Sequence, residues 1–255
     1  MKTEKKDKSR REFLKKVATV VVGTAAASVI KPFNAIVYAT APKKDSEHWY
    51  GMGIDLDKCI GCGRCADACK QENGVPREPF FFRTWVEQYT IKENGEVVVE
   101  SPNGGIDGFK QSVPDNEIFK SFFVPKMCNH CAHSPCVQVC PVGATYESPD
   151  GVVLVDDTYC IGCRYCVQAC PYGCRYIHPE RHVVDKCTLC YHRIKKGLRP
   201  ACEDACPRKA KIFGDLRDKN SELVKFLKEH TCLVLRPHLN TGAKVYYNSL
   251  STEVR

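Results

Sequence analysis

Residues 59–69 read Cys-Ile-Gly-Cys-Gly-Arg-Cys-Ala-Asp-Ala-Cys and place four cysteines at the spacing C-x2-C-x2-C-x3-C. The same spacing recurs about a hundred residues later, at residues 160–170, where a proline follows the last cysteine. Two related motifs, C-x2-C-x4-C-x3-C at residues 128–140 and C-x2-C-x11-C-x3-C at residues 187–206, also end in Cys-Pro. Together the four motifs contain sixteen of the 18 cysteines in the chain.

This spacing is the ligand pattern of bacterial ferredoxins, in which four cysteine thiolates hold one cubane iron–sulfur cluster. Sixteen cysteines therefore predict four [4Fe–4S] clusters, and a chain with four clusters is expected to transfer electrons. In two-cluster ferredoxins the fourth cysteine of each motif binds the cluster of the other motif. We therefore expect the four motifs to exchange ligands in pairs.

Other uses of cysteine fit the sequence less well. A disulfide framework is typical of short secreted chains without a core, whereas this chain has 255 residues and is 43% apolar. A zinc site would use two separated C-x2-C pairs rather than crowded runs. No C-x2-C pair precedes a histidine, which excludes covalent haem. Residues 61–66 formally fit a G-x-G-x-x-A dinucleotide motif, but ligand cysteines occupy two of its positions, so we interpret them as a cluster loop.

The first 39 residues predict export. Residues 9–15, Ser-Arg-Arg-Glu-Phe-Leu-Lys, contain the paired arginines Arg10 and Arg11 of a twin-arginine signal. An apolar stretch at residues 17–30 has the length of a signal peptide rather than a membrane span. Cleavage is expected after Ala39, with an uncleaved anchor as the alternative. The mature protein is then expected to be periplasmic, and to reach the membrane only through a partner.

The basic character of the chain comes mainly from this segment. The formal net charge is +8, but residues 1–39 hold nine Lys/Arg and three Asp/Glu, so residues 40–255 carry +2. A cubane with four thiolates carries −2 when oxidised. Four such clusters add −8, so the loaded protein carries about −6. This charge gives no support to nucleic-acid binding.

The rest of the chain predicts an α+β fold, with residues 50–255 as one domain. Strands are expected at residues 50–56 and 151–155, before the two equivalent motifs, and each motif should contain a short helix. Residues 70–127 form a long insertion, in which strands at 84–91 and 96–99 flank Asn94-Gly95, a type I′ hairpin signal. Residues 102–105 predict a loop, residues 221–230 an amphipathic helix, and residues 232–235 and 244–247 the terminal strands.

Two cysteines and three histidines lie outside the ligand count. Cys174 and Cys232 are interpreted as structural thiols, with a redox-active role as the alternative. The histidines beside the motifs could donate hydrogen bonds to cluster sulfurs, although such residues are more often solvated; they are His130, His133 and His192.

The chain resembles the iron–sulfur (beta) subunits of molybdopterin oxidoreductase complexes, a family that includes those of the polysulfide, thiosulfate, tetrathionate and dimethyl sulfoxide reductases and of the formate-dependent nitrite reductase system. The resemblance covers about residues 50–250. Besides the cysteines it rests on Cys170-Pro171-Tyr172-Gly173, Asp185-Lys186-Cys187-Thr188-Leu189-Cys190, Pro200-Ala201-Cys202 and Ile212-Phe213-Gly214-Asp215-Leu216. It implies a duplicated bacterial-type 2[4Fe–4S] ferredoxin-like fold.

The resemblance also implies which cysteines share a cluster, with the first motif paired to the fourth and the second to the third. We call the resulting groups ligand sets 1 to 4. They are Cys59, Cys62, Cys65 and Cys206 (set 1); Cys69, Cys187, Cys190 and Cys202 (set 2); Cys128, Cys131, Cys136 and Cys170 (set 3); and Cys140, Cys160, Cys163 and Cys166 (set 4).

In this family, such a protein connects an integral membrane subunit, which interacts with quinone, to a catalytic subunit that usually contains molybdopterin. A multihaem cytochrome in place of the catalytic subunit agrees equally well with the sequence. We therefore expect an electron-transfer subunit with no substrate site of its own. Two other functions were considered: a standalone soluble periplasmic ferredoxin shuttle, and a catalytic iron–sulfur enzyme with one iron free for substrate.

Overall fold

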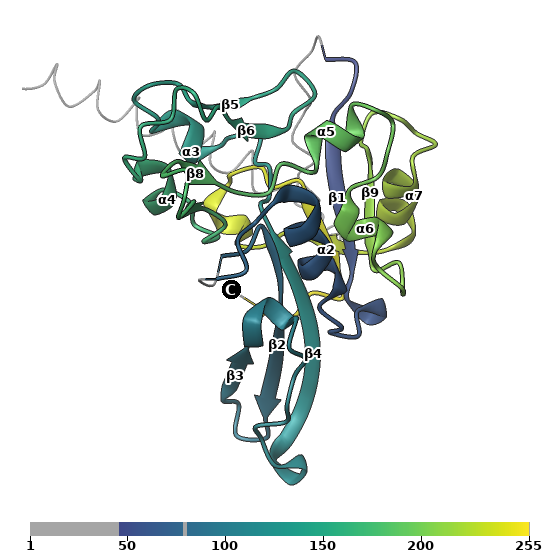
Figure 1. Cartoon of the computed structure of the whole chain (residues 1–255). Helices are drawn as coiled ribbons and strands as arrows, with labels where there is room; N and C mark the ends of the chain where they lie inside the picture. Colours follow the sequence, from purple (N-terminus) through teal and green to yellow (C-terminus); the bar gives the residue numbers. More distant parts are fainter. Residues whose placement is uncertain (1–45, 79–80, 255) are drawn as a thin grey trace, which may run out of the picture. The chain divides into compact units, whose positions relative to one another are not determined.

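The computed structural model describes residues 46–78 and 81–254 (Figure 1). The predicted signal peptide at residues 1–39, with Arg10 and Arg11, lies outside the described residues and stays a prediction. The strands are β1 (Tyr50–Asp55), β2 (Thr84–Lys92), β3 (Val97–Glu100), β4 (Ile118–Met127), β5 (Thr145–Glu147), β6 (Val153–Val155), β7 (Tyr176–Ile177), β8 (Val184–Asp185), β9 (Lys211–Asp215), β10 (Cys232–Leu233) and β11 (Val245–Asn248). The α-helices are α2 (Arg64–Asn73), α3 (Pro135–Gln138), α4 (Tyr165–Gln168), α5 (Tyr191–Ile194), α6 (Ala201–Asp204) and α7 (Glu222–Glu229).

A four-stranded sheet with the order β10-β11-β1-β9 contains the strands at both ends of the described domain. β1 runs parallel to β11, with Met52 opposite Val245, and antiparallel to β9, with Gly53 opposite Ile212. α7 packs against β1 and β9. A Cβ atom at Gly53 would lie 2.7 Å from the Phe226 ring, so the close approach of α7 requires glycine there.

This sheet brings the first and fourth cysteine motifs together. β1 runs toward the first motif and β9 follows the fourth, so their antiparallel pairing places the two motifs side by side, and α2 contacts α6. The second and third motifs meet through the antiparallel pair β5–β6 and the contact of α3 with α4. Each motif therefore lies beside the motif with which the resemblance pairs it.

Residues 70–127 include a second sheet with the order β3-β2-β4 (Figure 1). The β2–β3 hairpin is confirmed, but the predicted type I′ turn is wrong. The Gly95 N–H donates to Lys92 O (2.9 Å) and the Lys92 N–H to Glu96 O (2.8 Å), so the loop has three residues. Only Gly95 has a positive φ in this loop, +84°, which is the pattern of a type I turn followed by a glycine bulge.

The other expected elements are confirmed, with bounds that differ by a few residues. Strands occur within 50–56, 151–155 and 232–235, and β11 overlaps residues 244–247. α7 lies within 221–230, and residues 102–105, expected to be a loop, form a short 3₁₀ turn. No helix among the described residues is long and apolar enough to span a membrane.

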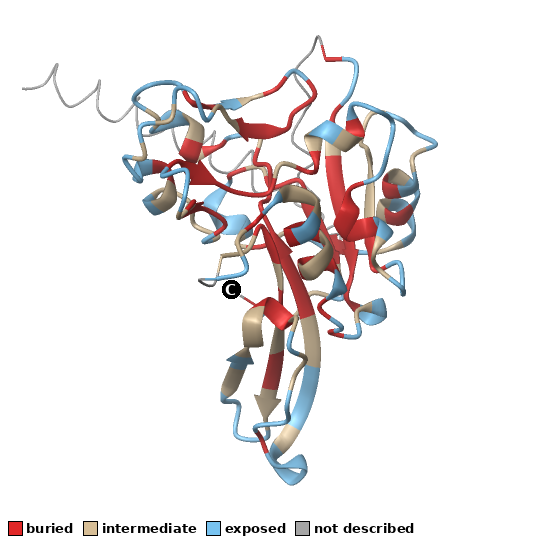
Figure 2. Cartoon of the chain, in the orientation of Figure 1, coloured by how far each residue is buried: buried red, intermediate tan, exposed pale blue. Residues whose placement is uncertain are grey.

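Cysteine sulfurs lie inside the main hydrophobic core. The buried residues of this core include Met52, Ile54, Val124 and Tyr247, and they pack with Cys65, Cys128, Cys187 and Cys202. Figure 2 shows the buried parts of the ribbon in red, whereas the lower part of the β3-β2-β4 sheet is mostly intermediate or exposed. The core is thus built partly around thiols rather than around hydrocarbon alone. Anything bound to these sulfurs would be surrounded by apolar side chains.

Candidate iron–sulfur ligand sites

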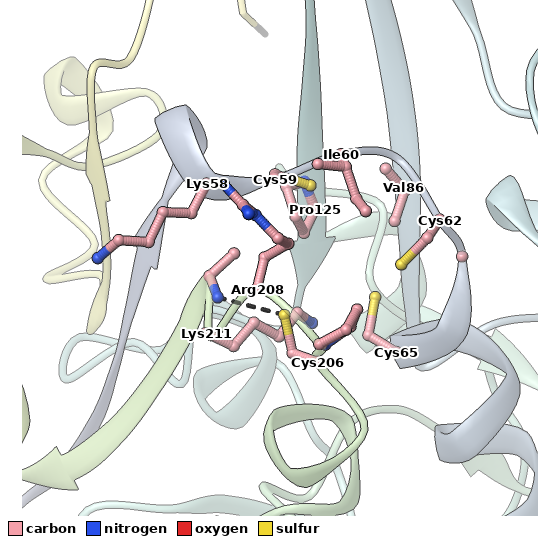
Figure 3. A pocket seen from close by; sticks show the side chains of 13 residues that line it. Lys58, Cys59, Ile60, Cys62, Cys65, Val86, Pro125, Cys206, Arg208 and Lys211 are labelled. Carbon is pink, nitrogen blue, oxygen red and sulfur yellow. Dashed lines mark hydrogen bonds between the residues drawn. The ribbon is translucent and has the colours of Figure 1, made fainter.

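The cysteines of set 1 surround one cavity, although Cys206 is far from the others in sequence. The cavity encloses about 350 Å³, partly open to solvent, and its lining includes Cys59, Cys62, Cys65 and Cys206. Figure 3 shows their four sulfur atoms around a shared space, with Val86 and Pro125 as apolar walls. Cys62 is exposed, whereas Cys65 is buried.

The cysteines of set 2 also line a single cavity, and all four are buried: Cys69, Cys187, Cys190 and Cys202. The space between these cysteines measures about 250 Å³ when the part open to solvent is included. The side chain of Asn73, at the end of α2, provides an amide donor that lies 3.5 Å from Cys69 Sγ and 3.7 Å from Cys190 Sγ. Arg83 fixes this amide through a 2.9 Å hydrogen bond to Asn73 Oδ1, and Asp185 pairs with the guanidinium at 2.8 Å.

The cysteines of set 3 line a third cavity, of about 310 Å³, and they are Cys128, Cys131, Cys136 and Cys170. Arg175 is buried in its wall and donates from Nη2 to Cys136 Sγ at 2.9 Å. The side chain of Asn129 also lines this cavity, and among the described residues its buried amide has no hydrogen-bond partner.

The cysteines of set 4 lie on the segments around α3 and α4. Cys140 follows α3, Cys160 and Cys163 precede α4, and Cys166 is part of α4. Cys160 and Cys166 share a small apolar cluster with Cys136 of set 3, which places the two sets next to each other. Cys163 is exposed, as Cys62 is in set 1. Sets 1 and 4 therefore reach the surface, whereas sets 2 and 3 are mostly buried.

Backbone N–H groups point at several of these sulfurs. Thr145 donates to Cys140 Sγ (3.4 Å), Val184 to Cys160 Sγ (3.4 Å), Leu189 to Cys187 Sγ (3.4 Å) and Ala210 to Cys206 Sγ (3.2 Å). Of these four donors, Leu189 has a positive φ (+53°), and Gly61 (+68°) and Gly162 (+67°) also have a positive φ in the loops of the two equivalent motifs. Such donors stabilise a sulfur that carries negative charge.

As free thiols, four of these cysteines would be neutral at pH 7. Burial raises the pKa of Cys59 and Cys187 to about 11 and the pKa of Cys131 and Cys202 to about 12. A metal ligand must be a thiolate, so iron binding to these cysteines would release protons. Cys170 differs, because the adjacent Cys174 side chain and the backbone N–H groups of Cys174 and Tyr172 lower its pKa to about 6 despite burial.

Buried cations show that the cavities suit an anionic group. Lys186 and Lys211 are 1–2% exposed and Arg175 is 5% exposed. None of the three forms an ion pair with a carboxylate in the described part of the chain. A buried cation without a counter-charge is costly. Four thiolates on an iron–sulfur cluster supply that charge, so the residues present fit the predicted group.

Sequence reasoning missed these cations, because lysine and arginine are usually solvated. Their position was the available signal: Lys186 directly precedes Cys187, and Arg175 follows Cys170 by five residues. Sequence reasoning also left the histidines open. His133 and His192 are exposed, and His192 contacts Glu72 at 2.6 Å. His130 is buried, and its Nδ1 accepts the Val153 N–H at 3.1 Å.

Both remaining cysteines are buried. The Cys174 thiol donates to Met127 O at 3.1 Å, and Cys232 packs with Leu223, Phe226 and Tyr246 beneath α7. Cys232 is thus part of an apolar cluster, as expected for a structural thiol. Cys174 lies in the main core beside set 3.

Two family models match the chain, and both describe a 4Fe-4S dicluster domain. One matches residues 58–144 and the other residues 119–216. Between them they include all four cysteine motifs.

Similar curated proteins cover almost the whole chain. A tetrathionate reductase subunit of Salmonella typhimurium is 37% identical over 96% of this chain and 89% of its own length. Protein NrfC of Escherichia coli is 38% identical over 93% of this chain and 94% of its own length. The iron-sulfur subunit of a putative dimethyl sulfoxide reductase from Halobacterium salinarum is 39% identical over 78% of each.

Proposed function

Because the chain belongs to the family of ferredoxin-like iron–sulfur subunits of molybdopterin oxidoreductase complexes, we propose that it carries four [4Fe–4S] clusters, one on each ligand set. The family makes it an electron-transfer subunit of a reductase complex. The proposal adds the number of clusters, their ligands, the partners and the exported location. The electrons would pass between a quinone-linked membrane subunit and a catalytic molybdopterin or multihaem subunit of an exported respiratory complex.

One observation carries the proposal for the ligands. Cysteines up to 147 positions apart, Cys59 and Cys206, line a single cavity, and the same holds for sets 2 and 3. Each cluster, when bound, accepts and gives up one electron at a time. The protein's part is to hold the thiolates, to donate hydrogen bonds to the sulfurs and to place charge nearby.

The order of electron flow through the chain follows from which sets are neighbours. Set 1 adjoins set 2 because α2 carries Cys65 and Cys69, one from each set. Sets 3 and 4 adjoin through the cluster of Cys136 with Cys160 and Cys166. With Cys62 and Cys163 exposed at sets 1 and 4, electrons would enter and leave there, through sets 2 and 3. No general acid, base or nucleophile is needed for this role.

The test is to purify the chain with a C-terminal tag under anaerobic conditions, from detergent-solubilised membranes. We expect about sixteen iron atoms and as many sulfides per chain, from four cubanes. Serine at the exposed ligand Cys62 or Cys163 should disturb the signal of one cluster each, as seen by electron paramagnetic resonance (EPR). Serine at the non-ligand Cys232, which packs beneath α7, is the matched control and should leave the iron content unchanged.

Proteins that copurify test the partners. A molybdopterin subunit or a multihaem cytochrome together with a membrane protein would support the proposed complex. Recovery of the chain alone under several mild conditions would contradict it and favour the soluble shuttle. An iron content near half the expected value would contradict the four-cluster assignment instead.

A further inference from the structure

Three of the buried cations lie between successive ligand sets: Lys211, Lys186 and Arg175. We call them the junction cations. Their exposed fractions are 2%, 1% and 5%, and none of the carboxylates in the described residues forms an ion pair with them. Arg83 beside set 2 is different, because Asp185 matches its charge at 2.8 Å. The negative charge that balances the junction cations must therefore come from the sulfurs around them.

Lys211 lies between sets 1 and 2. It lines the set 1 cavity (Figure 3), and its Nζ donates to Thr84 Oγ1 at 2.8 Å, while Thr84 lines the set 2 cavity. Burial lowers the pKa of Lys211, but the sulfurs of Cys202 in set 2 and Cys65 in set 1 raise it more, so this pKa lies above its usual value. One ammonium group thus faces both sets.

Lys186 lies between sets 2 and 3. Its Nζ donates to the carbonyl oxygen of Cys187, a set 2 residue, at 2.7 Å. It also donates to the carbonyl oxygen of Val153, which lines the set 3 cavity. Burial lowers the pKa of Lys186, and Cys128 of set 3 and Cys187 of set 2 are the neighbours that oppose this shift most strongly.

Arg175 lies between sets 3 and 4. Its Nη2 donates to Cys136 Sγ of set 3 at 2.9 Å, and its Nη1 donates to Thr145 Oγ1 at 3.3 Å. The backbone N–H of the same Thr145 donates to Cys140 Sγ of set 4 at 3.4 Å. The guanidinium therefore contacts Cys136 of set 3 directly, and it is linked to Cys140 of set 4 through Thr145.

We propose that each junction cation raises the reduction potentials of the two clusters beside it, and of no others, by offsetting the repulsion between them. Reduction adds one negative charge to a cluster that already faces an anionic neighbour. A buried positive charge between the two stabilises that added charge, and the effect falls with distance. This inference rests on the proposed function, because it requires clusters on the ligand sets.

The experiment replaces the cations at opposite ends of the row and compares their effects. Lys211→Met and Arg175→Met each remove one buried charge while keeping an apolar stem. The four midpoint potentials are measured by anaerobic titration with dithionite, followed by EPR. Cys62→Ser identifies the signal of set 1, and Cys163→Ser that of set 4.

We expect Lys211→Met to weaken reduction of the set 1 and set 2 clusters at least tenfold, a fall of about 59 mV for one electron. Arg175→Met should do the same to sets 3 and 4 and leave sets 1 and 2 unchanged. Lys211→Arg keeps the charge and should restore the potentials. Arg199→Met, which removes an exposed arginine, is the control and should change none of the four.

Two results would overturn the inference. One is a fully loaded Lys211→Met variant with unchanged potentials, and the other is an equal shift of all four clusters, which would indicate a general effect of net charge. If a methionine variant loses iron, Lys211→Gln and Arg175→Gln remove the same charges and give the same comparison with a polar side chain in place. A wild-type protein without four clusters would instead contradict the proposed function.

Discussion

Replacing Gly63 by alanine should destabilise the first cysteine motif, by an amount that the structure lets us work out. Gly63 follows Cys62 and precedes α2, with φ +66°. A Cβ atom there would lie 2.1 Å from Gly105 O and 2.8 Å from Ile106 Cα, and real Cβ contacts do not fall below 3.0 Å. One of the two backbone segments must therefore move by about 0.9 Å.

Two costs add up in this variant. Holding alanine at a left-handed φ costs about 1 kcal/mol, and overpacking against the backbone typically costs about 1–3 kcal/mol more. A total near 3 kcal/mol corresponds to a fall of roughly 6–12 °C in the unfolding midpoint of a domain of this size. The assay is anaerobic heating at one fixed rate, with loss of the cluster absorbance as the signal, because such unfolding is seldom reversible.

Arg164 provides the internal control. It follows Cys163 in the equivalent motif and has almost the same backbone conformation, with φ +67°, but it is exposed and carries a full side chain. Arg164→Ala should therefore shift the midpoint by no more than about 2 °C. If Gly63→Ala behaved like Arg164→Ala, the contact with Gly105 would not be rigid and our account of the loop would be wrong.

Three further outcomes are expected. Changing both Arg10 and Arg11 to lysine should block export, so immunoblots of cell fractions should show the protein retained in the cytoplasm; normal periplasmic recovery would refute the twin-arginine assignment. Arg83→Met leaves the buried Asp185 without its main partner and should cost about 3 kcal/mol, a fall of roughly 6–12 °C in the midpoint of the same anaerobic heating, relative to the Arg83→Lys variant. Tyr247→Phe removes the hydrogen bond to Pro125 O (3.2 Å) and should cost about 1 kcal/mol by the same method, whereas no change would mean that this bond is not formed.

The sequence was most informative where chemistry fixes the spacing of residues. A cubane requires thiolates at short, repeated intervals, so the motifs could be recognised without any knowledge of the fold. The β2–β3 hairpin was also predictable, because Asn94-Gly95 marks a turn between two apolar runs. The turn type was not, because the two-residue and three-residue loops both accept glycine at a positive φ, and strand register decides between them.

Long-range pairing was beyond what local patterns can show. β9 was recognised only as a run of residues shared with a family, and its antiparallel pairing with β1 depends on residues more than 150 positions away. Buried lysines were missed for a related reason. A lysine is predicted to be solvated unless its counter-charge is known, and part of that charge comes from sulfurs of distant motifs, Cys128 for Lys186 and Cys65 for Lys211.

The ligand pairing has a consequence for how the protein can be assembled. Sets 3 and 4 draw all their cysteines from residues 128–170, whereas sets 1 and 2 need residues on both sides of that segment. The pairing of β1 with β9 brings the cysteines of sets 1 and 2 together from the two sides of that segment. β11, at the C-terminal end of the domain, also pairs with β1. Contacts between residues so far apart in sequence are expected to form late in folding, because the entropic cost of closing the intervening chain comes before the gain from the contacts. The central segment can therefore organise its two sets first, and sets 1 and 2 complete the row only once the whole chain is present. Under the proposed export, such a protein would benefit from being loaded before it crosses the membrane, since its thiols would otherwise meet an oxidising compartment while sets 1 and 2 were still open.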